Sequence, residues 1–237
     1  MHTVTSLSIF FPMYNEQGTI RRMVEKALEV LQELAVDYEV LIVDDASSDG
    51  SERIADELAR QHPQVRVVRH ERNRGYGAAL RSGFYGATKE LVFYTDCDEP
   101  VDLREIGRAL PLIGPQADLV IGYRLRRYDT LRRFVYSKVY NLLCRLLLGV
   151  HVRDVNFSFK LIRREALQRI RLTAASAFID GELLAEAVRY GYRIAEIPVE
   201  YFPRRSGRSS FDSLKAARDT LRELLAYWWR TRVRRLP

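Results

Sequence analysis

The chain has 237 residues, of which 38 are Lys or Arg and 31 are Asp or Glu, so its formal net charge is +7. This length suits one well-packed domain and is too short for two large ones, and a charged share of 29% excludes wholesale disorder. The longest uncharged stretch, Met1–Asn15, is shorter than a membrane-spanning helix and lacks the basic start of a secretory signal. Two cysteines, Cys97 and Cys144, exclude a disulfide framework and predict a cytosolic protein.

Short apolar runs alternate with segments of helical spacing over the first 120 residues. We predict strands at Leu7–Phe11, Glu39–Val43, Val65–Val68, Leu91–Tyr94 and Leu119–Ile121, and helices at Gly18–Leu34, Ser51–Arg60, Gly77–Ala87 and Leu103–Leu110. This alternation predicts an α/β, Rossmann-like fold with a mostly parallel sheet and helices on both faces. Ligands bind such sheets beyond the carboxyl ends of the strands.

The pattern changes after residue 122. We predict helices at Leu131–Gly149, Ile179–Arg189 and Asp212–Arg235, strands at Phe157–Ile162 and Arg193–Tyr201 (interrupted by Pro198), and a basic loop at Pro203–Ser210. The charge changes too, from a net −7 over residues 1–119 to +14 over residues 120–237. Most of the basic residues are Arg, which binds phosphate in bidentate fashion, although a bias toward Arg codons would also explain them. The charge division predicts different partners for the two halves.

Two polar motifs follow the first two predicted strands. Pro12 is expected to end its strand because proline cannot continue a central ladder. Beyond it, Tyr14 suits stacking on a base and Glu16 suits a hydrogen bond to a base or ribose, although a plain turn is the alternative. In Asp44–Gly50, Asp45 suits hydrogen bonding to a nucleobase or ribose, and Asp49 suits capping of the next helix.

Two further motifs follow later strands. Asn73–Ala79 opens a helix, and its glycines let the backbone approach an anion closely. Asp96 and Asp98 follow a buried strand, where two carboxylates suit a hard divalent cation whose shell phosphate oxygens complete. The alternative for this pair is an ordinary acidic turn. All four motifs fall beyond strand ends, so the sequence predicts one site at that edge of the sheet.

Together the four motifs resemble those of the family 2 inverting glycosyltransferases of GT-A fold. Pro12–Glu16 is similar to that family's Pro-x-Tyr-Asn-Glu, Asp44–Gly50 to Asp-Asp-x-Ser-x-Asp-Gly, Asn73–Ala79 to Asn-x-Gly-x-Gly-x-Ala, and Asp96–Asp98 to Asp-x-Asp. Further similar segments are Asp154–Lys160, Arg189–Val199 and Arg204–Ser210, so the resemblance covers nearly the whole chain. The subgroup that it resembles most is the dolichyl- and polyprenyl-phosphate sugar synthases without transmembrane helices.

The resemblance implies that a hexose, mannose or glucose, is moved from a UDP or GDP sugar to a polyprenyl or dolichyl phosphate. Asp98 and Asp96 would hold Mg²⁺ or Mn²⁺, which neutralises charge on the departing diphosphate. The implied donor-binding residues are Pro12, Tyr14, Glu16, Asp45, Asn73, Gly77 and Asp96. One position departs from the subgroup: Pro100 stands where a Gln near the metal is expected, and Glu99 is the candidate to compensate.

A lipid phosphate is already ionised at neutral pH, so it needs positioning and charge neutralisation more than a general base. The residues expected to bind the acceptor phosphate are Arg124, Arg133, Ser137, Arg204 and Arg205. Arg124 and Arg205 are also expected to act in catalysis, together with Asp96 and Asp98. If the acceptor is a hydroxyl, Asp180 or Glu182 is the candidate base, unless both are structural or favoured by a helix dipole. We expect residues 1–122 to bind the donor and residues 123–237 the acceptor, within one continuous domain.

Two basic amphipathic helices are expected to touch a membrane surface, or else to pack on the core or a partner subunit. Their apolar residues at helical spacing are Tyr136, Val139, Tyr140, Leu143, Leu146 and Leu147 in the first and Leu214, Ala217, Leu221, Leu225 and Trp228 in the second. The expected location is the cytoplasmic face of a membrane. Other hypotheses are transfer to a glycan, protein or small-molecule hydroxyl, and nucleotide-sugar binding without turnover. Nucleic acid is not expected as a partner, because only the pI of 9.5 favours it.

Overall fold

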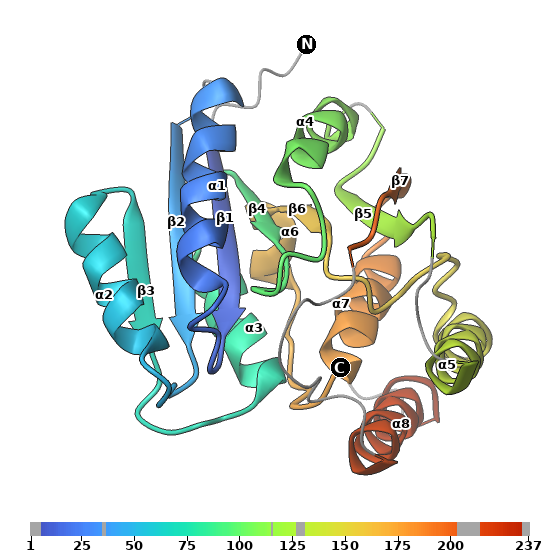
Figure 1. The fold of residues 1–237 in the computed structure, drawn as a ribbon. Helices are drawn as coiled ribbons and strands as arrows, with labels where there is room; N and C mark the ends of the chain where they lie inside the picture. The colour runs from blue at the N-terminus through green and yellow to red at the C-terminus, as the bar shows by residue number, and fades with distance from the viewer. Residues whose placement is uncertain (1–5, 35–36, 115, 127–130, 203–213, 234–237) are drawn as a thin grey trace.

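The computed structural model describes residues 6–34, 37–114, 116–126, 131–202 and 214–233. Its centre is a seven-stranded sheet in the order β3-β2-β1-β4-β6-β5-β7 (Figure 1). The strands are β1 (Ser6–Met13), β2 (Asp37–Asp44), β3 (Val65–Arg69), β4 (Leu91–Tyr94), β5 (Leu119–Arg124), β6 (Lys160–Arg163) and β7 (Ile194–Val199). β6 runs antiparallel to β4 and β5, whereas the other neighbours pair in parallel. The predicted mostly parallel sheet is confirmed.

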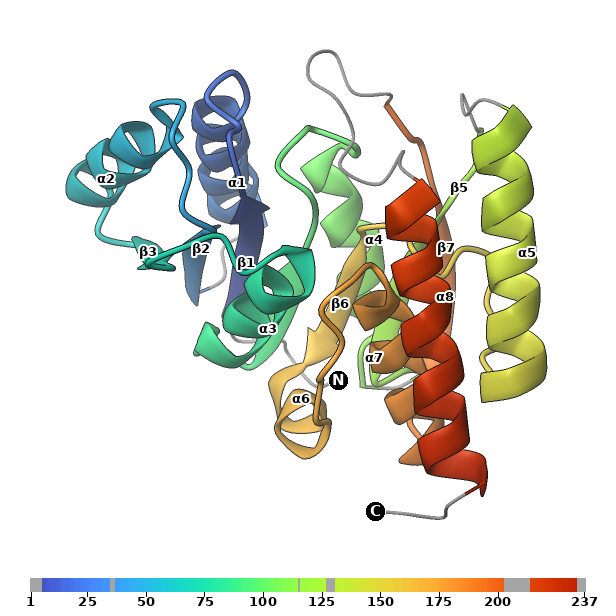
Figure 2. The same ribbon diagram turned by 90° about the horizontal axis from the view of Figure 1, so that it is seen from below.

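Helices cover both faces of the sheet (Figure 2). One face carries α1 (Ile20–Leu34), α2 (Ser51–Gln61) and α4 (Ile106–Ala109), and the other carries α3 (Tyr76–Gly86), α6 (Arg164–Arg169) and α7 (Phe178–Arg189). Two further helices, α5 (Leu131–Leu148) and α8 (Leu214–Trp228), pack against α7 and against each other. A π-helical turn, Trp229–Val233, follows α8.

Alternation along the strands divides the core into two clusters. In β4, Phe93 packs with the cluster that includes α1, whereas Tyr94 packs with the cluster of α3 and α7. This follows because successive side chains of a strand point to opposite faces. Lys160 of β6 is opposite Tyr94 in the antiparallel register, so the two side chains share the α3 and α7 face. A lysine is thereby placed inside the apolar core.

The carboxyl ends of β1, β2, β3 and β4 lie at one edge of the sheet, the lower edge in Figure 1, because these strands pair in parallel. The connections that leave this edge carry all four polar motifs. The four motifs therefore lie together at the edge of the sheet where ligands of parallel sheets bind, as predicted.

Several predicted boundaries were wrong. β1 continues past Pro12 to Met13, because β1 pairs with β4 only as far as Phe10 and no ladder bond is lost at the proline. The single helix predicted over Leu103–Leu110 is a chain of short pieces: η1 (Leu103–Glu105), α4 and η2 (Leu110–Leu112). The third piece contains Pro111, which cannot donate a helical hydrogen bond.

Further differences lie in the second half. The strand predicted over Phe157–Ile162 begins only at Lys160, and the short helix α6 that follows it was not predicted. β7 continues through Pro198, which is tolerated because β7 is an edge strand. The predicted basic loop Pro203–Ser210 lies outside the described residues.

Candidate active site at the carboxyl edge of the sheet

Hydrogen bonds join the loops that follow β1 and β2. The backbone N–H of Asn15 donates to Ser47 Oγ over 3.0 Å, and Asn15 Oδ1 accepts from the N–H of Ser48 over 2.8 Å. The N–H of Gln17 donates to Asp49 over 3.0 Å. The first two motifs therefore form one connected wall of the site.

Asp49 serves the start of α2, as predicted, but from one position before the residue that precedes the helix. The residue before α2 is Gly50, in a left-handed conformation and without a side-chain cap bond. Asp49 instead accepts from the N–H and the hydroxyl of Ser51, the first residue of α2. Its carboxylate thus satisfies a donor of the first helical turn while holding the loop after β1.

Three residues without glycine's freedom adopt a left-handed backbone at this edge. Asn15 has a φ of 57°, Ala46 of 62° and Glu99 of 58°, and they follow β1, β2 and β4 respectively. Such a conformation costs an L-residue about 1–2 kcal/mol. Strained residues persist where function needs a particular backbone path, so their concentration in neighbouring loops supports a binding site here.

Asp45 is buried and holds the third motif in place. Its carboxylate accepts from the N–H groups of Arg74 and Gly75, both over 2.8 Å. The ring nitrogen Nδ1 of His70 lies 2.6 Å from Asp45 Oδ1, and Nε2 of the same ring lies 2.8 Å from Ser82 Oγ. The carboxylate predicted to bind a base is therefore anchored first to the loop before α3.

Gly77 allows the start of α3 to meet a distant loop. A Cβ at this position would lie 2.3 Å from the carbonyl oxygen of Ala174, and the N–H of Gly77 donates to the carbonyl of Ala175 over 3.1 Å. This close backbone contact explains the glycine whether or not a donor binds. Asn73 is exposed, and its Oδ1 accepts from the N–H of Gly75.

The remaining predicted donor residues line the same edge. Pro12 lies near the end of β1 and is half-buried, whereas Tyr14 is 46% exposed, as a stacking platform for a base requires. Glu16 is half-buried and accepts from the hydroxyl of Thr19 over 3.3 Å. The structure brings these residues together with Asp96, and their donor-binding roles stay predictions.

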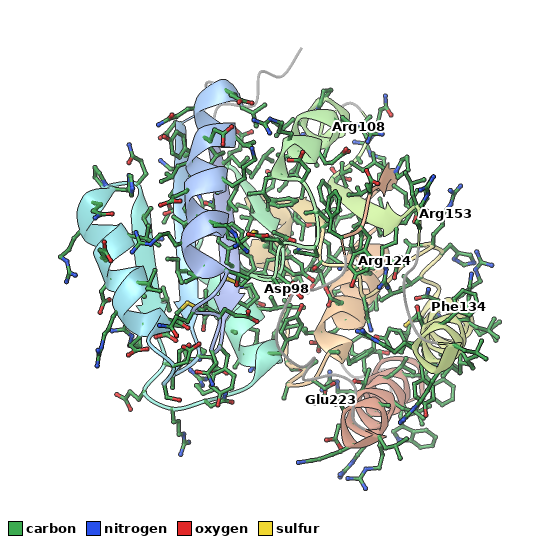
Figure 3. The ribbon with its side chains drawn as sticks, viewed as in Figure 1. Asp98, Arg108, Arg124, Phe134, Arg153 and Glu223 are labelled. Atoms are coloured by element: carbon green, nitrogen blue, oxygen red, sulfur yellow. The ribbon has the colours of Figure 1, made fainter. Side chains whose placement is uncertain are left out.

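Asp96 and Asp98, two interacting carboxylates that follow β4, form the acidic centre of the edge. Figure 3 marks the place of Asp98. Burial, and after it repulsion by the Asp98 carboxylate, raise the pKa of Asp96 to about 7. The hydroxyl of Tyr76 donates to Asp96 Oδ1 over 3.0 Å. A bound cation would relieve the repulsion between these two neighbouring carboxylates.

The donor set fits a divalent cation that shares its shell with a ligand. Within the described ranges no three His, Cys, Asp or Glu side chains gather closely enough to hold a metal by themselves. Mg²⁺ is typically bound by one or two carboxylates together with substrate phosphates, and the Asp96–Asp98 pair can supply that number. The fit is therefore to a cation that binds together with a diphosphate.

Glu99 is not directed at the metal site in this structure. Its Oε1 lies 2.6 Å from Nε of Arg22 on α1, and this pairing raises the pKa of the Arg22 guanidinium. Replacement of the missing Gln by Glu99 therefore requires this ion pair to open. An exposed ion pair contributes little free energy, so opening costs little.

The predicted acceptor residues are placed around β5 and α5. Arg124, at the end of β5, makes two hydrogen bonds to Asp154, of 2.7 and 3.1 Å, and its guanidinium lies near the rings of Phe157 and Tyr201. In Figure 3 it lies to the right of Asp98, toward α5. Asp154 was not predicted as a partner of Arg124. Its two hydrogen bonds fix the orientation of the guanidinium group.

Arg133 and Ser137 lie one turn apart on α5 and so share a side of that helix. That side also carries the buried Cys144, so it faces the body of the molecule. Asn141 of the same helix bonds to the backbone of Arg153 and Val155, on either side of Asp154. Arg204 and Arg205 lie outside the described residues, and the roles of all these residues stay predictions.

Asp180 and Glu182, the candidate bases for a hydroxyl acceptor, are both buried and engaged. Asp180 Oδ1 lies 2.7 Å from Nζ of Lys160. Glu182 accepts from the N–H groups of Thr173 and Ala174, both over 2.8 Å, and from the Thr173 hydroxyl. The structure therefore favours the structural interpretation of both carboxylates.

The outer face of α5 is apolar, whereas on α8 the exposed apolar side chains share their face with the exposed Arg218. On α5, five residues spaced by three or four are between 47% and 78% exposed: Leu131, Val135, Val139, Leu142 and Leu146. On α8 and the turn after it the exposed set is Leu214, Leu221, Leu225 and Trp229. Tyr140, Leu143 and Leu147 of α5 and Trp228 of α8 pack toward the core instead, which was the alternative expectation for these helices. Across the described part of the chain, no helix is long and apolar enough to cross a membrane.

Several polar side chains of the site were not predicted, above all the half-buried Tyr76 and the buried Tyr94 and Lys160. The signal for Lys160 was present: a lysine stands among the apolar residues of Phe157–Ile162, and a buried charge is rarely without a partner. Asp154 carried no such signal, because its partner Arg124 is 30 residues away.

A family model described as glycosyl transferase family 2 matches residues 8–171. The chain belongs to this family. The expectation of an enzyme that transfers sugar is thereby confirmed, and binding without turnover is not supported. Glycosyltransferase AglD of Haloferax volcanii is 32% identical over 237 residues, and the match covers 96% of this chain but 38% of AglD. Polyprenol monophosphomannose synthase of Mycolicibacterium smegmatis is 31% identical over 213 residues, which covers 85% of this chain and 79% of that synthase.

Solved structures confirm the GT-A fold of this family 2 glycosyltransferase. Glucosyl-3-phosphoglycerate synthase from Mycobacterium tuberculosis, in complex with Mn²⁺, UDP-glucose and phosphoglyceric acid, superposes with a TM-score of 0.72 at 21% identity, covering 94% of this chain and 80% of that one. The same synthase with Mg²⁺ and UDP gives 0.71 at 23% identity, covering 94% and 79%. At 21% and 23% sequence identity, these structures show that the fold is shared and nothing more.

Proposed function

We propose that this glycosyltransferase moves a hexose from a nucleotide diphosphate sugar to a polyprenyl phosphate at a membrane surface, with a divalent cation. One observation carries the proposal: Asp96 and Asp98 follow β4, and α5 and α8, which expose apolar side chains, pack against α7, which shares a core cluster with β4. Residues 1–122 bind the donor and residues 123–237 bind the acceptor. The similarity to a polyprenol monophosphomannose synthase supports this choice of acceptor.

The donor binds across the loops after β1, β2 and β3. Tyr14 stacks on the base, Asp45 holds the loop before α3, and Gly77 keeps the start of that helix close to the edge. Asp98 and Asp96 would hold Mg²⁺ or Mn²⁺ together with the diphosphate. When bound, that cation neutralises the charge that develops on the leaving group.

An oxygen of the acceptor phosphate attacks C1 of the sugar from the face opposite the nucleoside diphosphate. The bond between C1 and the diphosphate oxygen breaks, the nucleoside diphosphate leaves, and the configuration at C1 inverts. As a phosphate is already ionised, no side chain has to remove a proton from it. This agrees with the engagement of Asp180 and Glu182 in buried hydrogen bonds. Arg133 and Ser137 position the phosphate from α5, and Arg124 contributes positive charge from the end of β5.

The exposed apolar side chains of α5 and α8 contact the membrane surface. Helical geometry places Lys138 and Arg145 on one side of the α5 stripe and Arg132 on the other. An apolar stripe with flanking cations suits the boundary between acyl chains and anionic headgroups. A polyprenyl chain can then stay in the membrane while its phosphate reaches the edge of the sheet.

A transfer assay tests the proposal. Radiolabelled UDP- and GDP-hexoses are combined in turn with dolichyl and undecaprenyl phosphate, with Mg²⁺ or Mn²⁺ or with EDTA. We expect labelled lipid from one donor, none in EDTA, and none from Asp98→Ala. Transfer to a sugar or protein hydroxyl with every polyprenyl phosphate absent would contradict the proposed acceptor.

A further inference from the structure

A chain of polar side chains runs from the acidic edge into the core. The hydroxyl of Tyr76, the first residue of α3, donates its proton to Asp96, and the Tyr94 hydroxyl lies next to it. Tyr94, in turn, donates to Asp180 on α7. Nζ of Lys160 ends the chain, 2.7 Å from Asp180 and 3.3 Å from the Tyr94 hydroxyl. These contacts join α3, β4, β6 and α7.

The inner end of this chain is fully satisfied. Lys160, Tyr94 and Asp180 are each no more than 2% exposed. The ammonium of Lys160 has three acceptors, because besides Asp180 and Tyr94 it donates to the carbonyl of Phe157 over 2.7 Å. A buried ion pair with all its donors used is geometrically rigid, and each partner fixes the other. The Tyr94 hydroxyl is therefore held at a definite place.

We infer that Tyr76 is a positioning residue for Asp96, and that the buried Tyr94–Asp180–Lys160 cluster fixes Tyr76. Asp96 needs such a partner, because repulsion from Asp98 would otherwise favour rotation of its carboxylate away from the edge. The hydroxyl of Ser158 is a second hydrogen-bond partner of Asp96. This inference rests on the proposed function for its ligand, a divalent cation bound with a nucleoside diphosphate.

The backbone supports the same geometry. Tyr76 is the residue between Gly75, whose N–H is held by Asp45, and Gly77, whose N–H is held by Ala175. The start of α3 is therefore fixed on both sides of Tyr76. Its ring enters the α3 and α7 cluster, and only the hydroxyl reaches Asp96.

Removal of single hydroxyl groups tests the inference. We measure Mn²⁺ binding calorimetrically in the presence of UDP and, separately, of GDP, for the unsubstituted protein, Tyr76→Phe and Tyr85→Phe. Tyr85 is the matched control: it lies on the same helix and its hydroxyl makes two hydrogen bonds, to Ile170 and Leu172, away from the edge. We expect Tyr76→Phe to weaken Mn²⁺ binding roughly three- to tenfold, as loss of a hydrogen bond to a charged group should. Tyr85→Phe should lower the melting temperature without changing Mn²⁺ binding.

A second comparison tests whether Tyr94 acts through Tyr76. Tyr94→Phe alone should weaken Mn²⁺ binding, and the double variant Tyr76→Phe/Tyr94→Phe should bind Mn²⁺ as Tyr76→Phe does, since groups acting in series are not additive. Unchanged Mn²⁺ binding in Tyr76→Phe, equal weakening in Tyr85→Phe, or multiplied losses in the double variant would each overturn the inference. Absence of Mn²⁺ binding by the unsubstituted protein with either nucleotide would contradict the proposed function as well.

Discussion

Asp96 illustrates how burial and charge prepare a residue for a cation. Its pKa is raised from the ordinary value near 4 to about 7, first by burial and then by Asp98. Between these values the folded protein holds a proton that the unfolded chain releases. For this group, the free energy of unfolding therefore falls as the pH rises from about 4 to about 7. A bound cation would offset the repulsion that appears above pH 7.

This linkage predicts how Mn²⁺ stabilises the protein at different pH values. With UDP or GDP present, Mn²⁺ should raise the melting temperature more at pH 7.5 than at pH 5.5, because at the lower pH it must displace a proton from Asp96. Thermal melts with and without Mn²⁺ measure the difference. Asp96→Asn should flatten the pH dependence, and an equal Mn²⁺ shift at both pH values would contradict the assignment.

Ala46 is the clearest case of backbone strain in the site loops. At a φ of 62°, glycine should fit better than alanine, so Ala46→Gly should raise the free energy of unfolding by about 0.5–1 kcal/mol. Ala59→Gly, within α2, is the matched control and should lower it by about 1 kcal/mol. Chemical denaturation measures both. Destabilisation by Ala46→Gly would show that the left-handed turn is not strained.

At the scale of elements, α3 depends on a close approach to the loop before α7. Gly77→Ala should lower the free energy of unfolding by about 2 kcal/mol or more, because the new Cβ meets backbone atoms of Ala174 and Ala175 that cannot move freely. It should also weaken UDP or GDP binding, since the loop before α3 shifts with it. Gly86→Ala, at the other end of α3, meets only side-chain methyl groups, of Leu41 at 3.3 Å and Val68 at 3.9 Å, and should be nearly neutral. Equal melting temperatures for the two variants would contradict this explanation.

The outer stripe of α5 makes a separate prediction. Leu146 is 69% exposed, so Leu146→Glu should leave the melting temperature unchanged. It should reduce cosedimentation with anionic lipid vesicles roughly tenfold, because burying a leucine in lipid contributes about 1.5–3 kcal/mol. Tyr190→Glu replaces a similarly exposed apolar side chain at the end of α7 and should bind vesicles normally. Vesicle binding that is unaffected by Leu146→Glu would exclude this face of α5.

Strands and helices with a clear apolar repeat could be predicted from the sequence. So could the position of the site at the carboxyl ends of the strands, which follows from the alternation of strands and helices. β1, β2 and β4 are short buried runs, so their positions, and with them Asp45 and Asp96, followed from the apolar pattern. Contacts between distant residues did not follow. The pairing of Arg124 with Asp154 and of Lys160 with Asp180 depends on the antiparallel insertion of β6, which no local pattern indicates. Which side of α5 packs on the core could not be predicted either, because the apolar residues of this helix are distributed all around its axis.

At the scale of the whole molecule, the charge division matches two surfaces of different chemistry. The half with a net charge of −7 contributes the acidic edge, which suits a cation and its diphosphate, and the half with +14 contributes α5 and α8. A single sheet joins these halves through the β4–β6 pair. The proposed donor and acceptor surfaces therefore belong to one sheet and its helices.

The central claim is that Asp96 and Asp98 hold a cation beside a nucleoside diphosphate. The most direct measurement is an anomalous difference map from crystals of the protein grown with Mn²⁺ and UDP or GDP. We predict one strong peak coordinated by a carboxylate of this pair and by diphosphate oxygens. A nucleotide bound elsewhere, or a peak out of reach of both side chains, would contradict the claim.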